Sequence, residues 1–183
     1  MKIANLNMPS PKFTISQLKK ALANKSKEEL IAEIATLCQT FKPVKEYYVN
    51  LMGDDTDIIA KYKAIITKEF VWTKTSPPKA RLSVARQSVT DFKKISNKPE
   101  QIAEIMLYFV ECVSGFLTDY DGPENQYTSA ENMYEDTLKY MEQHTLLHQF
   151  ADRTKLVVIG ATDAYGHSDT LQSTYDDYYL SSQ

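Results

Sequence analysis

The stretch PEQIAEIMLYFVECVSGFL, residues 99–117, decides the fold class of this chain. Apolar residues recur in it at the three- and four-residue steps of an α-helix, and other apolar residues fill most of the remaining positions. A helix that is apolar nearly all round is usually central and buried. We therefore expect this segment to form the core helix of the protein. Its apolar positions include Ile102, Ile105, Met106, Phe109, Cys112, Val113 and Phe116.

Helical patterns continue on both sides of this segment. Ser26 and Glu29 have the spacing of a capping box, and an apolar stripe follows at Leu30, Ile34, Leu37 and Phe41. Further helices are predicted over about residues 15–22, 43–52, 58–72 and 79–95, and from about residue 129 to an end between 144 and 150. Only residues 156–159 leave a short strand open. The sequence thus predicts an all-α fold of eight or nine short-to-medium helices, in a bundle or a short α-superhelix.

Length and composition favour one helical domain. The 183 residues include two prolines near the start, so we expect an extended lead-in over residues 1–13 and a single domain over residues 14–183. No apolar run reaches the roughly 18 residues of a membrane span, and the start has no signal-peptide core. Cys38 and Cys112 are too few for a disulfide framework and are predicted to be buried thiols. These features predict a cytoplasmic protein without a membrane partner.

The stretch KLVVIGATDAYG, residues 155–166, resembles the glycine-rich turn of a dinucleotide-binding enzyme. Two features argue against that function. Asp163 would place a carboxylate where the pyrophosphate should lie, and only 17 residues follow Gly166, too few for the rest of a nucleotide-binding unit. We expect instead a helix that packs Leu156 and Ile159 inward and stops at Gly166, and we expect no cofactor.

A metal site is the next alternative. HTLLH places His144 and His148 one helical turn apart, and Asp152 extends that stripe if the helix continues. The catalytic glutamate of a metalloprotease motif is absent, so a metal-dependent enzyme using these three residues remains a minor alternative. Asp55 and Asp57 in DDTD do not fit a calcium loop and suit a helix N-terminus better. No serine or cysteine has a neighbouring histidine that suggests a catalytic triad.

Charge is distributed unevenly along the chain. Residues 61–98 hold ten basic and two acidic residues, whereas residues 99–183 hold three basic and fifteen acidic residues. The basic segment could bind nucleic acid, and Trp72 within it, beside the proline turn at residues 76–78, could stack on a base or pack on a peptide. No nucleic-acid motif accompanies the segment. We favour packing of the two segments against each other, or solvated faces. Lys79, Arg86 and Lys93 are predicted to line one edge of the helix over residues 79–95.

Four stretches resemble an uncharacterised family of small bacterial helical proteins, classed as a domain of unknown function. They are SKEELIAEI (26–34), FKPVKEYY (41–48), YKAIITKEF (62–70) and YGHSDTLQSTYDDYY (165–179). The resemblance implies a cytoplasmic bacterial protein with a helical domain and supplies no reaction or cofactor. It also implies an aromatic-glycine pair before an acidic residue, which Tyr165, Gly166 and Asp169 match, with His167 between them.

These observations favour a non-catalytic protein-interaction module that binds a protein partner or self-associates. The alternatives are a nucleic-acid-binding protein using residues 61–98 and the metal-dependent enzyme described above. Aromatic side chains suit interfaces, and twelve tyrosines are present. The candidate binding residues are Trp72, Lys79, Arg86, Lys93, Tyr165, His167 and Asp169.

Overall fold

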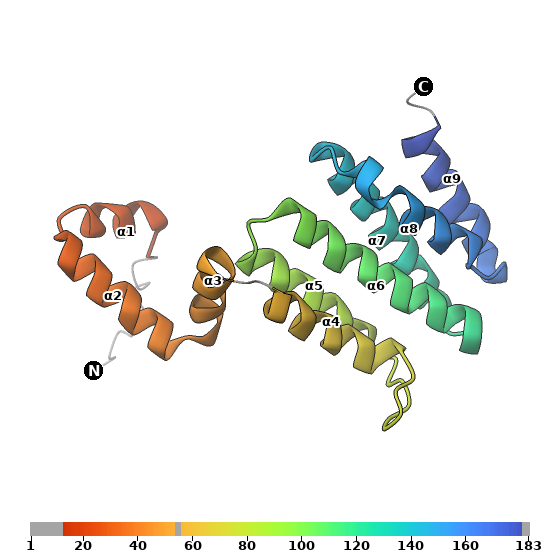
Figure 1. The fold of residues 1–183 in the computed structure, drawn as a ribbon, viewed down its shortest axis with the longest axis horizontal. Coiled ribbons are helices and arrows are strands. Elements are labelled where there is room, and N and C mark those ends of the chain that lie inside the picture. Colours follow the sequence, from red (N-terminus) through yellow and green to blue (C-terminus); the bar gives the residue numbers. More distant parts are fainter. Residues whose placement is uncertain (1–12, 54–55, 181–183) are drawn as a thin grey trace, which may run out of the picture. The chain divides into compact units, whose positions relative to one another are not determined.

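The fold is helical throughout the part of the chain that is described by the structure, a computed structural model covering residues 13–53 and 56–180. Within these ranges there are nine α-helices, a 3₁₀ turn and no β-strand, which confirms the predicted all-α class. Most of the predicted lead-in and Asp55 lie outside the described residues. The helices, shown in Figure 1, are α1 (Ile15–Leu22), α2 (Lys27–Thr40), α3 (Lys42–Met52), α4 (Thr56–Phe70), α5 (Leu82–Ile95), α6 (Pro99–Tyr120), α7 (Glu124–Gln143), α8 (Leu147–Ile159) and α9 (His167–Tyr179).

The chain divides into two units by its internal contacts, residues 1–45 and residues 46–183. The prediction of one domain over residues 14–183 stays a prediction. In the first unit, the predicted capping box at the start of α2 is present. The Ser26 hydroxyl accepts a hydrogen bond from the Glu29 amide at 3.1 Å, and the Glu29 carboxylate accepts one from the Ser26 amide at 2.7 Å. Two helix-terminal N–H groups are thereby satisfied.

The first unit contributes no buried side chain within residues 13–45. Its apolar stripe is present as predicted, but Ile34, Leu37 and Phe41 remain exposed. Short helices gain most of their stability from packing of an apolar face. The stability of the protein therefore rests mainly on the second unit.

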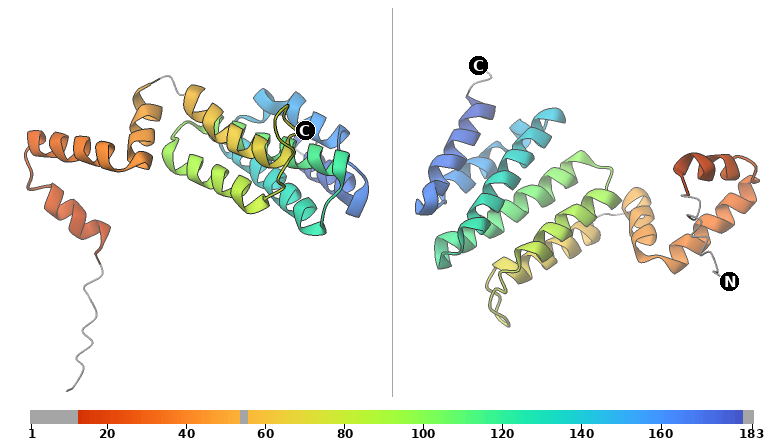
Figure 2. Two further views of the ribbon diagram at one scale, coloured as in Figure 1. Left: turned by 90° about the horizontal axis from the view of Figure 1, so that it is seen from below. Right: turned by 180° about the vertical axis from the view of Figure 1, so that it is seen from behind.

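In the second unit, three antiparallel helix pairs are stacked in a row: α4 with α5, α6 with α7, and α8 with α9 (Figures 1 and 2). The first helices of the pairs, α4, α6 and α8, lie side by side and form one layer. Of the two arrangements that the sequence left open, this row corresponds to the short α-superhelix. Stacked helix pairs expose an extended surface along one layer, which is a common binding surface in repeat proteins.

Helix α6 is the core helix, as predicted. It contacts α4, α5, α7 and α8, and Phe109 is fully buried within it. By length and composition α6 could cross a membrane, but 61% of its apolar 18-residue segment is buried inside the fold. A buried core helix can have this length and composition, so packing within the fold accounts for the hydrophobicity of α6.

The end of α8 differs from the prediction. Residues 156–159 are helical, but Leu156 and Ile159 are 63% and 68% exposed, and Val157 and Val158 are buried in their place. The inward stripe of α8 runs through Phe150 and Thr154, which shifts the buried face by one position. Gly166 has a φ of +70° and precedes α9, so it caps a helix start and does not stop the preceding helix.

The expected helical stripe from His144 to Asp152 is wrong. Helix α7 ends at Gln143 and α8 begins at Leu147, and Thr145 between them has a φ of +58°. This turn separates His144 from His148 and Asp152, because the chain does not continue as one helix. Among residues 13–53 and 56–180, no group of three His, Cys, Asp or Glu side chains is placed to hold a metal ion.

Candidate functional site

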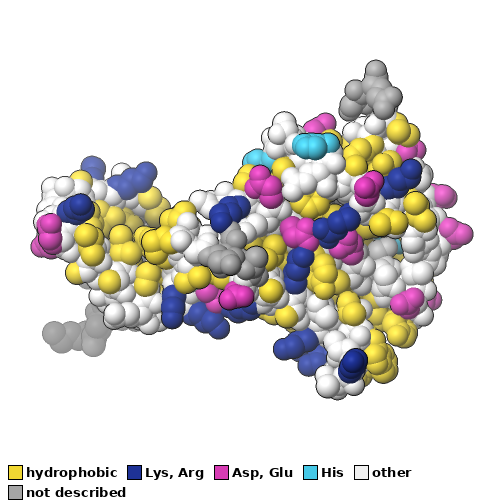
Figure 3. All heavy atoms as spheres, in the orientation of Figure 1, with side chains coloured by type: hydrophobic (Ala, Val, Ile, Leu, Met, Phe, Trp, Pro, Cys, Tyr) yellow, Lys and Arg dark blue, Asp and Glu magenta, His cyan; other side chains and the backbone are white. Residues whose placement is uncertain are grey.

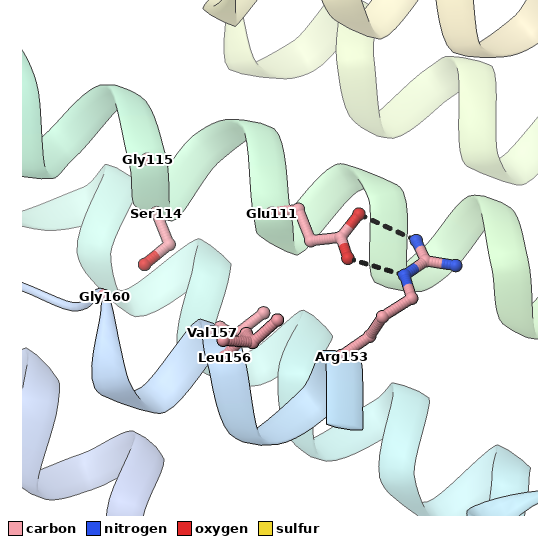
Figure 4. Close-up of a pocket in the computed structure, with 7 residues that line it drawn as sticks. All are labelled: Glu111, Ser114, Gly115, Arg153, Leu156, Val157 and Gly160. Atoms are coloured by element: carbon pink, nitrogen blue, oxygen red, sulfur yellow. Dashed lines mark hydrogen bonds and ion pairs between the residues drawn. The ribbon is translucent and has the colours of Figure 1, made fainter. Parts of the chain in front are cut away.

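The outward side of the α4, α6 and α8 layer carries an ion-pair network at its centre. We call this surface the α6 face. Glu104 of α6 pairs with Lys63 of α4 and with Arg153 of α8. Arg153 also makes two hydrogen bonds to Glu111, from Nε at 2.9 Å and from Nη2 at 2.8 Å, which Figure 4 shows as a parallel pair. The network therefore ties the three helices of the layer together, since each helix supplies at least one partner.

Two groups of this network, Glu104 and Arg153, are held in their charged forms. Burial acts to raise the pKa of Glu104, but hydrogen bonds from Arg153 and Lys63 outweigh it and hold that pKa below its ordinary value. Hydrogen bonds to Glu111 raise the pKa of Arg153, against the opposing effect of burial. Two cations thus balance two carboxylates. Neither Glu104 nor Arg153 is therefore placed to exchange a proton near neutral pH.

Hollows open on both sides of α6 on this face. A hollow of about 190 Å³ lies toward α8 and is drawn in Figure 4. A larger one of about 460 Å³, which we call the aromatic hollow, lies toward the end of α4. Figure 3 shows acidic and basic side chains grouped on this face, with hydrophobic side chains beside them. The aromatic hollow is lined by Phe70, Val71, Trp72, Tyr108, Glu111, Cys112, Gly115, Phe116, Asp119 and Tyr120.

Its aromatic rings form a row that runs from the surface into the core. Trp72 and Tyr120 are 62% and 53% exposed, and their rings are stacked with centroids 6.5 Å apart at 24°. Tyr120 in turn lies 5.3 Å from Phe116, and Phe116 lies 5.5 Å from the buried Phe70. Contacts of this kind fix ring orientation. The exposed end of the row is therefore anchored through the buried end.

Trp72 is positioned by a closed loop between α4 and α5. The backbones of Thr73 and Ser76 exchange two hydrogen bonds, of 3.1 and 3.3 Å, which close a tight turn directly after Trp72. The far end of the loop is fastened to α4, because the Glu69 carboxylate accepts hydrogen bonds from Arg81 Nε at 3.0 Å and Nη2 at 2.6 Å. A loop tied at both ends loses little further entropy when a ligand binds.

Gly115 lies inside α6 and lines both hollows. A Cβ atom placed there would meet nothing within 4 Å, so neighbouring side chains do not require a glycine. Glycine in a helix interior costs about 1 kcal/mol relative to alanine. Gly115 therefore destabilises α6 without being required by packing. Because glycine has no side chain, the surface of α6 between the two hollows stays open. An isolated glycine within the helical pattern was the sequence signal for this position, and sequence reasoning missed it.

The aromatic hollow has an acidic rim. Its two charged lining residues are Glu111, which is paired with Arg153, and Asp119, which is exposed in the last turn of α6. Cys112 also lines it, but burial raises the pKa of this thiol to about 11. The thiol is therefore protonated at neutral pH and is a poor nucleophile. These groups suit binding better than covalent chemistry.

His167 lies at a second site, which sequence reasoning did not assemble. Its imidazole is fully buried, with Nε2 3.1 Å from the Ser114 hydroxyl and Nδ1 2.8 Å from a Glu131 carboxylate oxygen. These distances match those of a Ser-His-acid triad. The serine, however, is buried within α6, where backbone N–H groups are used by the helix and cannot stabilise an oxyanion. The chain of hydrogen bonds instead fastens α9 to α6 and α7.

The chain matches the family described as "Family of unknown function (DUF6155)" over residues 14–170. It belongs to this family. The match confirms the expected membership of an uncharacterised family and covers both the α6 face and His167. No curated protein and no solved structure matches the chain. Its function must therefore be argued from its own residues.

The remaining candidate binding residues lie elsewhere on this DUF6155 protein, and none of them lines the aromatic hollow. Lys79 precedes α5, so it does not share a helix edge with Arg86 and Lys93, and that prediction is wrong. All three are exposed, and the Lys93 ammonium lies 5.6 Å from the Tyr140 ring centroid. Tyr165 is 64% exposed against Tyr127, and Asp169 is exposed in the first turn of α9.

Cys112 is buried as the sequence predicts, whereas Cys38 is only half-buried. Of the predicted binding residues, Trp72 alone belongs to a lined hollow with other exposed aromatic side chains. Phe116 was expected only as a core position, and Tyr120 and Asp119 were not singled out, since their proximity to Trp72 depends on how α4 packs beside α6.

Proposed function

We propose that this protein is a non-catalytic protein-interaction module and that its partner docks on the α6 face. The observation that carries this proposal is the exposed stack of Trp72 on Tyr120 above the aromatic hollow. Tryptophan and tyrosine are enriched among the residues that dominate binding energy at protein interfaces. Both rings are anchored, so a partner would meet a surface already in its binding conformation.

Apolar surface continues across α6 toward α8. Leu156 lines the smaller hollow and is 63% exposed, and Ile159 at the end of the same helix is 68% exposed. Gly115 lies between the two hollows and lines both. Exposed apolar patches with polar neighbours are typical of interaction sites. The partner is therefore expected to span α6 and to contact both sides of it.

The other function classes have weaker support. At least four of the ten basic residues in segment 61–98 form ion pairs with other described residues: Lys61 with Glu46, Lys63 with Glu104, Arg81 with Glu69, and Lys94 with Asp91. These pairs reduce the positive charge that the segment could offer to phosphate groups. The metal-dependent alternative loses its geometric basis at the turn between α7 and α8.

We also propose that the protein is bacterial and cytoplasmic. The support is the absence of a long apolar run in the sequence and the resemblance to a family of small bacterial helical proteins.

The proposal is tested by photo-crosslinking followed by reconstitution. A photoreactive phenylalanine analogue at position 156 is used in living cells to trap and identify the partner, which is then purified separately. We expect Trp72→Ala to weaken binding of the two purified proteins at least about tenfold, as for an interface hot spot. Tyr165→Ala is the matched control, because Tyr165 is equally exposed but lies outside the aromatic hollow.

Two results would overturn the proposal. One is a purified partner whose affinity is the same for Trp72→Ala and for the unchanged protein. The other is a loss of affinity in Tyr165→Ala of the same size, which would place the interface near α9. Self-association through Trp72 in the absence of any other protein, measured by sedimentation, would replace the partner by a second copy of this chain.

A further inference from the structure

The aromatic hollow has an unusual combination of lining groups. Five aromatic side chains and two carboxylates line it, and no lysine, arginine or histidine among the described residues does. The exposed faces belong to Trp72 and Tyr120, with Phe116 beneath them. The face of an aromatic ring carries a negative potential that attracts cations, and tryptophan attracts them most strongly.

One of the two carboxylates that line the hollow has no cation paired with it among the described residues. Lys63 and Arg153 balance Glu104 and Glu111 in the ion-pair network. Asp119 has no ion pair or hydrogen bond of this kind among the described residues, and it is exposed at the rim. The hollow therefore combines aromatic faces with a carboxylate that has no cation of its own.

The end of α6 adds to this negative potential. Asp119 and Tyr120 are the last two residues of the helix, where unpaired carbonyl groups give the helix dipole its negative end. The last turn contains no basic residue that would offset this charge. A positively charged group placed at the rim would thus be attracted by the helix end as well as by Asp119.

The same face already uses such contacts within the protein. The Lys63 ammonium lies 4.8 Å from the centroid of Tyr108, a ring that lines the hollow, and the Arg153 guanidinium lies 5.9 Å from the centroid of Phe150. Both cations also pair with carboxylates. We infer that the aromatic hollow binds the cationic end of a lysine or arginine side chain, held between Trp72, Tyr120 and Asp119. This inference rests on the proposed function for its protein partner.

The single tryptophan of the chain makes the test direct. Because Trp72 is the only tryptophan, the intrinsic fluorescence of the full-length protein reports on this hollow. The protein is titrated with Nα-acetyl-lysine amide and Nα-acetyl-arginine amide, with sodium chloride at equal ionic strength as the reference. Nα-acetyl-norleucine amide, which has a similar chain but no charge, is the ligand control. We expect saturable, millimolar binding of the two cationic amides and at least about fivefold weaker binding of the norleucine amide.

Two variants locate the binding site. Asp119→Asn should weaken binding of the lysine amide by about threefold or more, since one exposed charge contributes modestly in water. Asp169→Asn removes another exposed helical carboxylate and should leave the affinity unchanged. Tyr120→Leu keeps Trp72 as the reporter and should also weaken binding. Equal affinities for the lysine and norleucine amides, or equal effects of the two aspartate changes, would overturn the inference.

Further outcomes separate this inference from the proposed function. Choline that binds much more tightly than either amide would assign the hollow to a free organic cation and overturn the assignment to a side chain. If the cationic amides do not bind but a purified partner still depends on Trp72, the interaction surface stands and the cation site is wrong. If they bind and no partner depends on Trp72, the proposed function is wrong.

Discussion

Helix α6 has two sides that differ in what they contribute. Toward α5 and α7 its side chains are apolar and buried, with Phe109 and Val113 fully enclosed. Between α4 and α8 it carries Glu104, Glu111 and Gly115 beside two hollows. The buried residues of α6 are explained by hydrophobic packing and by the hydrogen bond between Ser114 and His167. The open side has two carboxylates, Glu104 and Glu111, which form ion pairs with Arg153. It also has Gly115, a glycine that no neighbouring side chain requires.

The comparison shows where binding can be sought in a helical protein of this kind. A stable core requires only the buried side, so residues that the core does not explain are candidates for contact with another molecule. The aromatic hollow meets this description, because Trp72 and Tyr120 are exposed aromatic side chains that the core does not explain. The following predictions test whether the two sides are as separate as the structure indicates.

The largest effect is expected on the buried side. Phe109→Ala should lower the free energy of unfolding by about 3–5 kcal/mol, because it removes a large side chain and leaves a cavity in a well-packed core. Urea denaturation followed by circular dichroism measures this loss. Phe116→Ala is the comparison, since Phe116 is only partly buried and should cost clearly less. Equal losses at the two positions would contradict the distinction between the two sides.

An intermediate effect is expected for the ion-pair network. Arg153→Met keeps much of the side-chain volume but leaves Glu104 and Glu111 without their shared partner. We expect a loss of about 1–2 kcal/mol after allowing for screening by solvent, because Arg153 is about one-third exposed. Thermal unfolding should show this loss shrinking in high salt. A change below experimental error would mean that the network does not hold the layer together.

The pH dependence of stability should reflect Glu104. Its pKa in the folded protein lies below the ordinary glutamate value of about 4.5, so its contribution is present above that value and is lost as the pH falls through the folded pKa. Unfolding measured between pH 6 and about 3 should therefore steepen below about 4.5, where the unfolded chain binds more protons. In Glu104→Gln this part of the pH dependence should be reduced. An identical slope in both proteins would show that the carboxylate has no lowered pKa.

Sequence patterns predicted the core well because burial follows a helical period. The segment over residues 99–117 and the Ser26 cap were both identified, since each depends on neighbours within one helix. At the end of α8 the same reasoning failed by one position, because Val157, Ile159 and Leu156 are equally apolar and only the packing of α8 on α6 and α9 selects among them.

Sites that join distant segments could not be predicted in this way. The hydrogen bonds of His167 reach Ser114 and Glu131, 53 and 36 residues away in the sequence. Trp72 was singled out as a side chain that could contact a partner, but its stacking on Tyr120 depends on the packing of α4 beside α6. Local periodicity contains no information on such contacts, which require the tertiary arrangement.

Gly115→Leu tests the central claim most directly, because it separates the fold from binding. A leucine side chain should improve helix propensity by a few tenths of a kcal/mol or more, and the space at position 115 is open, so the melting temperature should stay the same or rise. The same side chain would fill the surface between the two hollows. We predict that the affinity of the purified partner, measured by calorimetry, falls at least about tenfold while stability is kept. Unchanged affinity in this stable variant would contradict the assignment of the α6 face as the binding surface.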